Sequence, residues 1–149
     1  QDKGVFQMSY LDTKQALITQ FLAASVTGLT ADDIGYQNKF FDPSNKALWV
    51  SLHFIPATSQ MMGKTVTDKN EDRGVFQVSV FVPLDNAEYD NVQLQAVDEV
   101  LTGFQYNTST VYNGQQVDIL ESTVNQGRES ESWFQRDISI TYLTFSNRG

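Results

Sequence analysis

Apolar side chains recur along the chain with two different periods, one typical of helices and one typical of strands. Between Ser9 and Ser25 they fall near helical spacing, and Ser9 followed by Asp12 resembles a capping arrangement. This pattern predicts an amphipathic helix. Its expected apolar side consists of Tyr10, Leu11, Leu17, Ile18, Phe21 and Leu22.

A second helix is predicted from Asp90 to Phe104. Asp90 stands at the capping position and Gln93 at the position that would complete a capping box. The apolar stripe expected to be buried is Leu94, Val97, Val100, Leu101 and Phe104.

Strict alternation of apolar and polar residues predicts the main strands. Leu48–Ile55 alternates up to Pro56, and Gly74–Val82 alternates up to Pro83. Proline has no amide hydrogen for the ladder, so we expect both strands to end there. A short strand over Tyr36–Phe41 is also expected.

The last third of the chain predicts a hairpin and a long final strand. Asn113-Gly114 separates Thr110–Tyr112 from Gln115–Leu120, and both turn residues tolerate the positive φ of a two-residue turn. Residues 122–132 are polar and read as a connector. The final strand, Trp133–Phe145, places Ile138, Ile140 and Tyr142 on one face.

The order of these elements predicts an α+β domain, in which two main helices pack on a mostly antiparallel sheet. Residues 57–73 are polar and too long for a simple connection, so they should form a hairpin, a binding arm or a mobile lid, with residues 64–68 as a possible strand. Met8-Ser9 resembles a natural start, so residues 1–7 are interpreted as a tag or leader and 8–149 as one domain.

Composition and charge exclude several classes of function. The 149 residues are 40% hydrophobic, carry a formal net charge of −8 and include no cysteine. Disulfides, thiolate metal sites and cysteine nucleophiles are therefore excluded, and the negative charge argues against a nucleic-acid clamp. No apolar run is long enough for a membrane span and no signal peptide is evident, so we expect a soluble protein made in a cytoplasm.

Catalytic and metal-binding patterns are weak. His53 is the only histidine, so it has no second imidazole or thiol with which to hold zinc. The acidic doublets 32–33, 71–72 and 98–99 fit solvated charge better than a catalytic carboxylate pair, and residues 68–72 lack the glycine and final glutamate of a calcium loop. No phosphate-binding glycine motif occurs. We expect no enzyme activity, no cofactor and no metal.

Large aromatic residues appear on the strand faces opposite the aliphatic stripe, namely Trp49, Phe81, Trp133 and Phe145. A second apolar sheet face must be covered by the chain itself or by another chain. Within the chain, the long segment and the first helix could cover this face. Coverage by another chain would indicate an assembly protein.

Together these features resemble tail terminator (tail completion) proteins of long-tailed bacteriophages and prophages. The resemblance extends over residues 8–145. It is carried by the opening helix, Trp49 and Phe54 before Pro56, the long arm, the second helix and the late strand at Trp133, and its sharpest piece is Arg73–Pro83 (RGVFQVSVFVP).

The resemblance implies a structural virion protein made in the bacterial host. It would form a homo-oligomeric, six-fold ring at the head-proximal end of the tail tube, stop tube polymerisation and offer a surface to head-completion proteins. DNA would pass through the ring without specific binding, and no membrane would be involved. The alternatives are another head–tail connector, a tail tube subunit, or a small acidic protein-binding module, with an enzyme a distant third class.

The residues expected to make assembly contacts lie mainly on the arm. Contact with a neighbouring subunit or the tail tube is assigned to Met61, Met62, Lys64, Thr65 and Thr67. Arg73 and Arg136 are candidates for ion pairs between subunits. Solvated loop positions are the alternative interpretation for all of them, and isolated surface pairs contribute only about 0 to 1 kcal/mol.

Overall fold

A computed structural model describes residues 10–37, 39–61, 69–84 and 90–147, with the backbone alone for 56–61, 69–72 and 145–147. The elements are α1 (Tyr10–Ala23), the short 3-10 helix η1 (Ala31–Asp33), β1 (Ile34–Tyr36), β2 (Trp49–Met61), β3 (Lys69–Pro83), α2 (Asn91–Gly103), β4 (Ser109–Tyr112), β5 (Gln115–Val124), β6 (Arg128–Ser130) and β7 (Trp133–Asn147).

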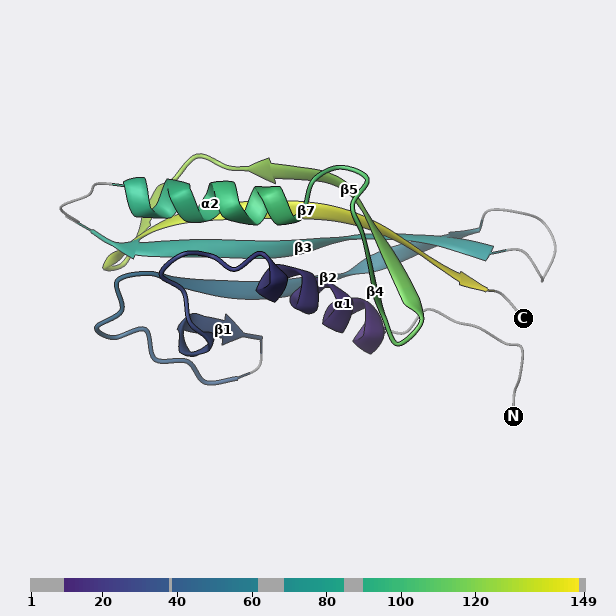
Figure 1. The fold of residues 1–149 in the computed structure, drawn as a ribbon, viewed down its shortest axis with the longest axis horizontal. Helices are drawn as coiled ribbons and strands as arrows, with labels where there is room; N and C mark the ends of the chain where they lie inside the picture. The colour runs from purple at the N-terminus through teal and green to yellow at the C-terminus, as the bar shows by residue number, and fades with distance from the viewer. Residues whose placement is uncertain (1–9, 38, 62–68, 85–89, 148–149) are drawn as a thin grey trace.

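The strands form a seven-stranded sheet in the order β1-β2-β3-β7-β5-β4, with β6 paired to β7 beyond the end of β5. Among the described strands, only β1 and β2 pair in parallel. Both helices lie on the same face of the sheet, and the β4–β5 hairpin curls down beside the start of α1 (Figure 1). The expected α+β class with a mostly antiparallel sheet is confirmed.

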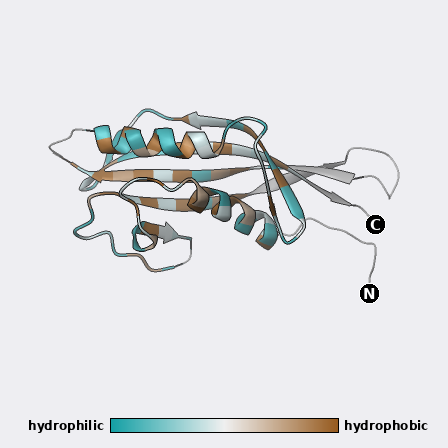
Figure 2. Cartoon of the chain, viewed as in Figure 1, coloured by the Kyte–Doolittle hydropathy of each residue, from teal (hydrophilic) through white to brown (hydrophobic). Residues whose placement is uncertain are grey.

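The core lies between this sheet face and the two helices. The alternating residues predicted to face inward are almost wholly buried in β3 (Phe76, Val78, Val80 and Val82) and in β7 (Ile138, Ile140 and Tyr142). Apolar and polar residues alternate along the central strands in Figure 2. The sequence pattern is therefore correct where a strand has one buried and one open face.

The helices are placed correctly, but part of their predicted apolar stripes is exposed. Tyr10, Leu11 and Leu22 are 56%, 63% and 49% exposed. The buried side of α1 also includes Thr13 and Ala16, small residues that bring the helix close to the sheet. In α2, Leu94 is exposed and the neighbouring Gln93 is buried.

The predicted capping box of α2 is wrong. Asp90 occupies the N-cap position but makes no side-chain cap hydrogen bond. Its carboxylate accepts a hydrogen bond from Arg136 instead, and Gln93 points into the sheet, because both side chains have stronger tertiary partners there. Ser9, the expected cap of α1, lies outside the described residues.

Several strand boundaries also differ from the prediction. The short strand spans Ile34–Tyr36, where it pairs with β2, and does not extend over Tyr36–Phe41. β2 continues past Pro56, because a register shift between Ile55 and Thr58 accommodates the residue that cannot donate. The polar segment 122–132 is not a simple connector, since it contains the end of β5 and all of β6.

The predicted hairpin turn is confirmed. Asn113 and Gly114 have φ values of 53° and 85°, and they join β4 to β5 in register from Tyr112–Gln115 onward. Asparagine and glycine are the residues that adopt this conformation at little cost.

Candidate functional site

The long polar segment after Ile55 begins and ends as a two-stranded arm. Thr58–Met61 of β2 pairs with Asn70–Arg73 of β3, and β7 runs beside β3 as far as Asn147. These strands extend well beyond the helices (Figure 1). The hairpin alternative for residues 57–73 is thus confirmed for the strands at its base.

Gly74 marks the root of the arm. A Cβ atom there would lie 2.5 Å from the Tyr142 hydroxyl and 2.7 Å from the Ile55 carbonyl oxygen. The Tyr142 hydroxyl donates to that same carbonyl at 3.4 Å. Glycine therefore lets β2, β3 and β7 approach closely where the sheet passes from core to arm.

The arm residues expected to make contacts are only partly placed. Met61 is the last residue of β2 and pairs with Asn70. Met62, Lys64, Thr65 and Thr67 lie outside the described residues. Their contact role stays a prediction.

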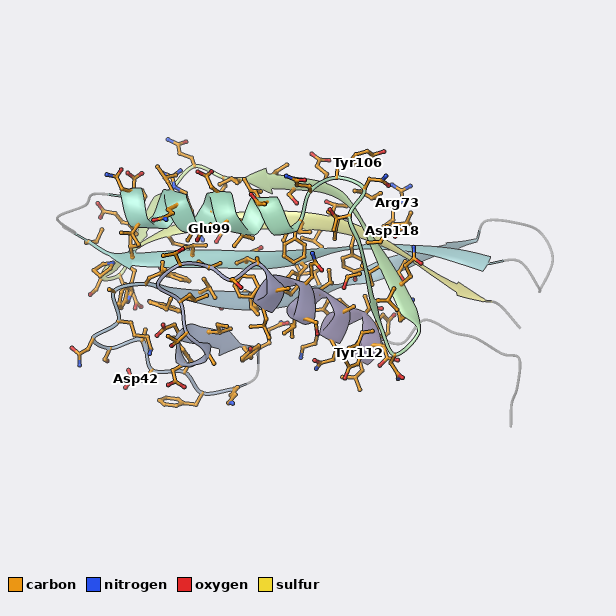
Figure 3. All side chains as sticks on the ribbon, viewed as in Figure 1. Asp42, Arg73, Glu99, Tyr106, Tyr112 and Asp118 are labelled. Carbon is orange, nitrogen blue, oxygen red and sulfur yellow. The ribbon has the colours of Figure 1, made fainter. Side chains whose placement is uncertain are left out.

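The two arginines named as inter-subunit candidates lie in different settings. Arg73 is exposed at the base of the arm, between Thr58 on β2 and Leu143 on β7 (Figure 3). Arg136 is held within its own chain, where its Nη2 donates to Asp90 Oδ2 at 2.8 Å. An inter-subunit role stays a prediction for both, and Arg73 has the more accessible position.

Arg136 helps to fix α2 on the sheet through the buried Gln93. Gln93 is 0% exposed, and its Nε2 donates to the carbonyl oxygens of Val80 and Phe134, both at 2.9 Å. Its Oε1 accepts from Arg136 Nε at 3.0 Å. These bonds satisfy both polar atoms of the Gln93 side chain and tie α2 to β3 and β7.

Three of the four aromatic residues expected on the second sheet face lie together there, on the side away from the helices. Trp49 stacks on Phe81 with ring centroids 3.9 Å apart and meets Trp133 edge-on at 5.6 Å. Phe41, from the connection between β1 and β2, covers Trp49 at 5.1 Å. The chain therefore covers part of this face itself with Phe41, and α1 does not take part because it lies on the opposite face. The side chain of Phe145 is not described.

Next to the aromatic cluster, the same face carries a polar network around Asp137. Its Oδ1 accepts from Ser79 and Gln135 at 2.7 and 2.8 Å, and its Oδ2 accepts from Arg128 at 2.8 Å. Burial on its own would raise the pKa of Asp137, but these hydrogen bonds outweigh it and hold that pKa below the ordinary 3.8. The carboxylate is thus charged at neutral pH and joins β3, β7 and the β6 hairpin.

His53 lies on this face too, with Nε2 2.9 Å from Ser51 Oγ. Asp137 directs its oxygens to Ser79, Gln135, Asn125 and Arg128, so it does not orient this imidazole as a triad carboxylate would. Among the described residues, no group of three His, Cys, Asp or Glu side chains could hold a metal ion. The arrangement suits a structural surface.

Two open grooves lie beside α1. One, of about 340 Å³, lies between the end of α1 and the segment leading to β1, and is lined by Phe21, Leu22, Ser25, Val26, Leu29, Thr30, Ala31 and Ile34. The other, of about 640 Å³, lies between the start of α1 and the β4–β5 hairpin, and is lined by Leu11, Asp12, Gln15, Tyr112 and Asn113. We call this second one the β4 groove.

Sequence reasoning missed the exposed apolar residues at the β4 groove. Leu11 and Tyr112 line the groove and are 63% and 41% exposed, and their chain neighbours Tyr10 and Val111 are 56% and 58% exposed. Tyr10 and Leu11 fit helical periodicity and so read as core. The sequence does contain one sign of the exposed surface. The apolar stripe of the first helix includes the adjacent residues Tyr10 and Leu11, and so is wider than packing on one sheet requires.

No helix in the described ranges is both long and apolar enough to cross a bilayer. A family model described as phage tail terminator protein matches residues 14–142. A search of curated proteins gives no match.

Solved structures show the same fold. One whose title gives no function has a TM-score of 0.69 at 20% identity, covering 92% of this chain and 96% of that chain. Another, titled as the virion of a native gene transfer agent particle, has a TM-score of 0.60 at 14% identity, covering 91% of this chain and 96% of that chain.

Proposed function

The chain belongs to the phage tail terminator protein family, a family of structural tail proteins, and from that premise we propose that it closes the head-proximal end of a tail tube as a six-subunit ring. The match over residues 14–142 is the observation that carries the proposal. In this role the ring stops tube polymerisation and presents a surface to head-completion proteins.

The geometry supports a ring subunit in two ways. The sheet ends in two edge strands, β1 and β4, which differ in sequence and surroundings. A closed ring uses heterologous contacts, in which one patch of each subunit meets a different patch on the next. The arm formed by β2 and β3 extends away from the core and supplies a further contact surface.

We assign the arm to contact with the neighbouring subunit or the tail tube, through Met61, Met62, Lys64, Thr65 and Thr67, with Arg73 at its base. DNA passes through the lumen without being held, because a chain with a net charge of −8 offers no general counter-charge for phosphate. Retention of DNA by the purified protein at moderate salt would contradict this last point.

Light scattering after size exclusion tests the ring. We expect a species of six times 16.8 kDa over a concentration series, and a larger fraction of the protein in this species when salt and magnesium are added. Binding at one end of purified tail tubes, seen by electron microscopy, tests the terminator role separately. A protein that stays monomeric and leaves tube ends bare would overturn the proposal.

The arm assignment has a matched control within the chain. Thr65→Glu places a charge on the arm, and Thr19→Glu places the same charge on the exposed side of α1. We expect the first variant alone to lose tube binding or ring formation. Equal behaviour of the two variants would contradict a contact role for the arm.

A further inference from the structure

The connection between β1 and β2 presents one large side chain directly to solvent. Phe40 is 89% exposed, which makes it the most exposed large hydrophobic residue among those described. Lys39 beside it is exposed as well. A phenylalanine held in water favours burial against a partner, because fully burying such a side chain gains about 1.5 to 3 kcal/mol.

The part of this connection that follows Phe40 is held in place by several contacts. Phe41 packs on Trp49, with ring centroids 5.1 Å apart. Lys46 Nζ lies 3.0 Å from Asp33 Oδ1 and 5.7 Å from the Phe41 ring. Asp42 Oδ1 accepts from the Ser44 amide at 3.0 Å. Phe40 therefore directly precedes an anchored segment, and this anchoring lowers the entropy lost on binding.

The β4 groove offers apolar contact together with a carboxylate. It has about 640 Å³ of open volume, and Leu11 and Tyr112 line it beside the polar side chains of Asp12, Gln15 and Asn113. Asp12 also lines the groove and accepts weakly from Asn113 at 3.3 Å. A carboxylate has room for several donors, so Asp12 can accept a lysine in addition to the partners it has within the chain.

The two surfaces lie apart on the molecule. The connection that carries Phe40 is at the lower left of Figure 1, and the β4–β5 hairpin is at the lower right. In Figure 3, Tyr112 marks the groove and Asp42, two residues after Phe40, marks the connection. One copy can therefore offer Phe40 to a second copy while its own groove receives a third.

We propose that Phe40 of one copy inserts into the β4 groove of the next copy, with Lys39 facing Asp12. The occupant is a second copy of this chain because the charges are complementary and because the two separate patches give the head-to-tail contact that a ring requires. The inference rests on the proposed ring and names the surface through which the ring closes.

Engineered thiols test this contact directly, since the chain has no cysteine of its own. A Ser44→Cys/Gln15→Cys double variant carries one thiol beside Phe40 and one in the β4 groove, and it keeps Phe40, Lys39, Leu11, Asp12 and Tyr112. A bifunctional maleimide should then link it into a ladder of dimers, trimers and larger species on a denaturing gel. A contact between two like surfaces would stop at the dimer. A Ser44→Cys/Tyr106→Cys variant is the control, because Tyr106 is 76% exposed but does not line the groove.

Mixing the two single variants separates the ends of the contact. Ser44→Cys with Gln15→Cys should give a cross-linked dimer, and neither variant should do so alone. If wild-type rings form but no link between 44 and 15 appears, this contact is wrong and the ring proposal stands. If the wild type stays monomeric, leaves tube ends bare and no link appears, both are wrong.

Charge reversal gives a readout that does not depend on cross-linking. Lys39→Glu should weaken assembly by at least about tenfold in subunit concentration, and Asp12→Lys should restore it in the same chain. Rescue requires the two charges to face each other across the contact, so a merely misfolded variant would not show it. Assembly that is unchanged in Lys39→Glu and Phe40→Ala, or not rescued by the reversal, overturns the proposal.

Discussion

Replacing Gln93 by alanine should destabilise the protein far more than replacing a glutamine on the exposed side of a helix. The substitution removes two hydrogen bonds to backbone carbonyls and one from the Arg136 guanidinium, all in a site with 0% exposure. A neutral bond contributes about 1 kcal/mol net and a bond to a charged group about 1.5 to 3. Releasing the glutamine rotamers returns about 1.5 to 2 kcal/mol, so we expect a net loss of about 1.5 to 3.5 kcal/mol.

Gln95 is the matched control, since it has the same side chain on the same helix but is exposed. Gln95→Ala should change the free energy of unfolding by no more than about 0.5 kcal/mol. Urea unfolding followed by circular dichroism measures both variants. Equal protein concentrations are required, because self-association adds to the apparent stability.

A double-mutant cycle with Arg136→Met separates the charged bond from the loss of packing. We expect a coupling energy of at least about 1 kcal/mol between Gln93 and Arg136. The reasoning is refuted if Gln93→Ala costs no more than Gln95→Ala. It is refuted in part if the cycle shows no coupling, which would leave only packing as the role of Gln93.

Three further substitutions follow from the geometry. Asp137→Asn should lower the free energy of unfolding at pH 7, and unfolding curves of the variant and the wild type should converge below about pH 4. A carboxylate with a lowered pKa stabilises the fold above its unfolded pKa, and this stabilisation is lost as pH falls through its folded pKa. Gly74→Ala should cost about 1 to 3 kcal/mol by overpacking against the Tyr142 hydroxyl, measured as a lower urea midpoint. Gly114→Ala, with φ of +85° and nothing within 4 Å of its Cβ, should cost only about 1 kcal/mol of backbone strain by the same measurement.

The central strands could be predicted because their pattern follows directly from burial on one face. Phe76 to Val82 and Ile138 to Tyr142 alternate without interruption, and nothing in the tertiary structure competes with that pattern. The hairpin at Asn113-Gly114 could be predicted equally well, because the turn needs two positive φ values that few other residues adopt.

Other elements depend on partners far away in the sequence. β6 is polar and three residues long, and it is a strand only because β7 offers a free backbone edge beyond β5. Gln93 is buried because Arg136, 43 residues later, reaches it from β7. A pattern within one helix contains no information on such a partner, so it reads glutamine as a surface residue.

Assembly surfaces are harder to infer for a related reason. A helical stripe does not distinguish an apolar residue that faces the core from one that faces another subunit, so the pattern places Tyr10 and Leu11 in the core.

The charge of the chain gives an independent constraint on assembly. In the proposed ring, six chains of formal net charge −8 carry −48 in total. Closure of such a ring has to overcome a long-range repulsion, which dissolved salt reduces by screening. Salt screens separated charges more strongly than a close, partly buried pair, so moderate salt should favour closure even though the proposed contact includes Lys39 and Asp12.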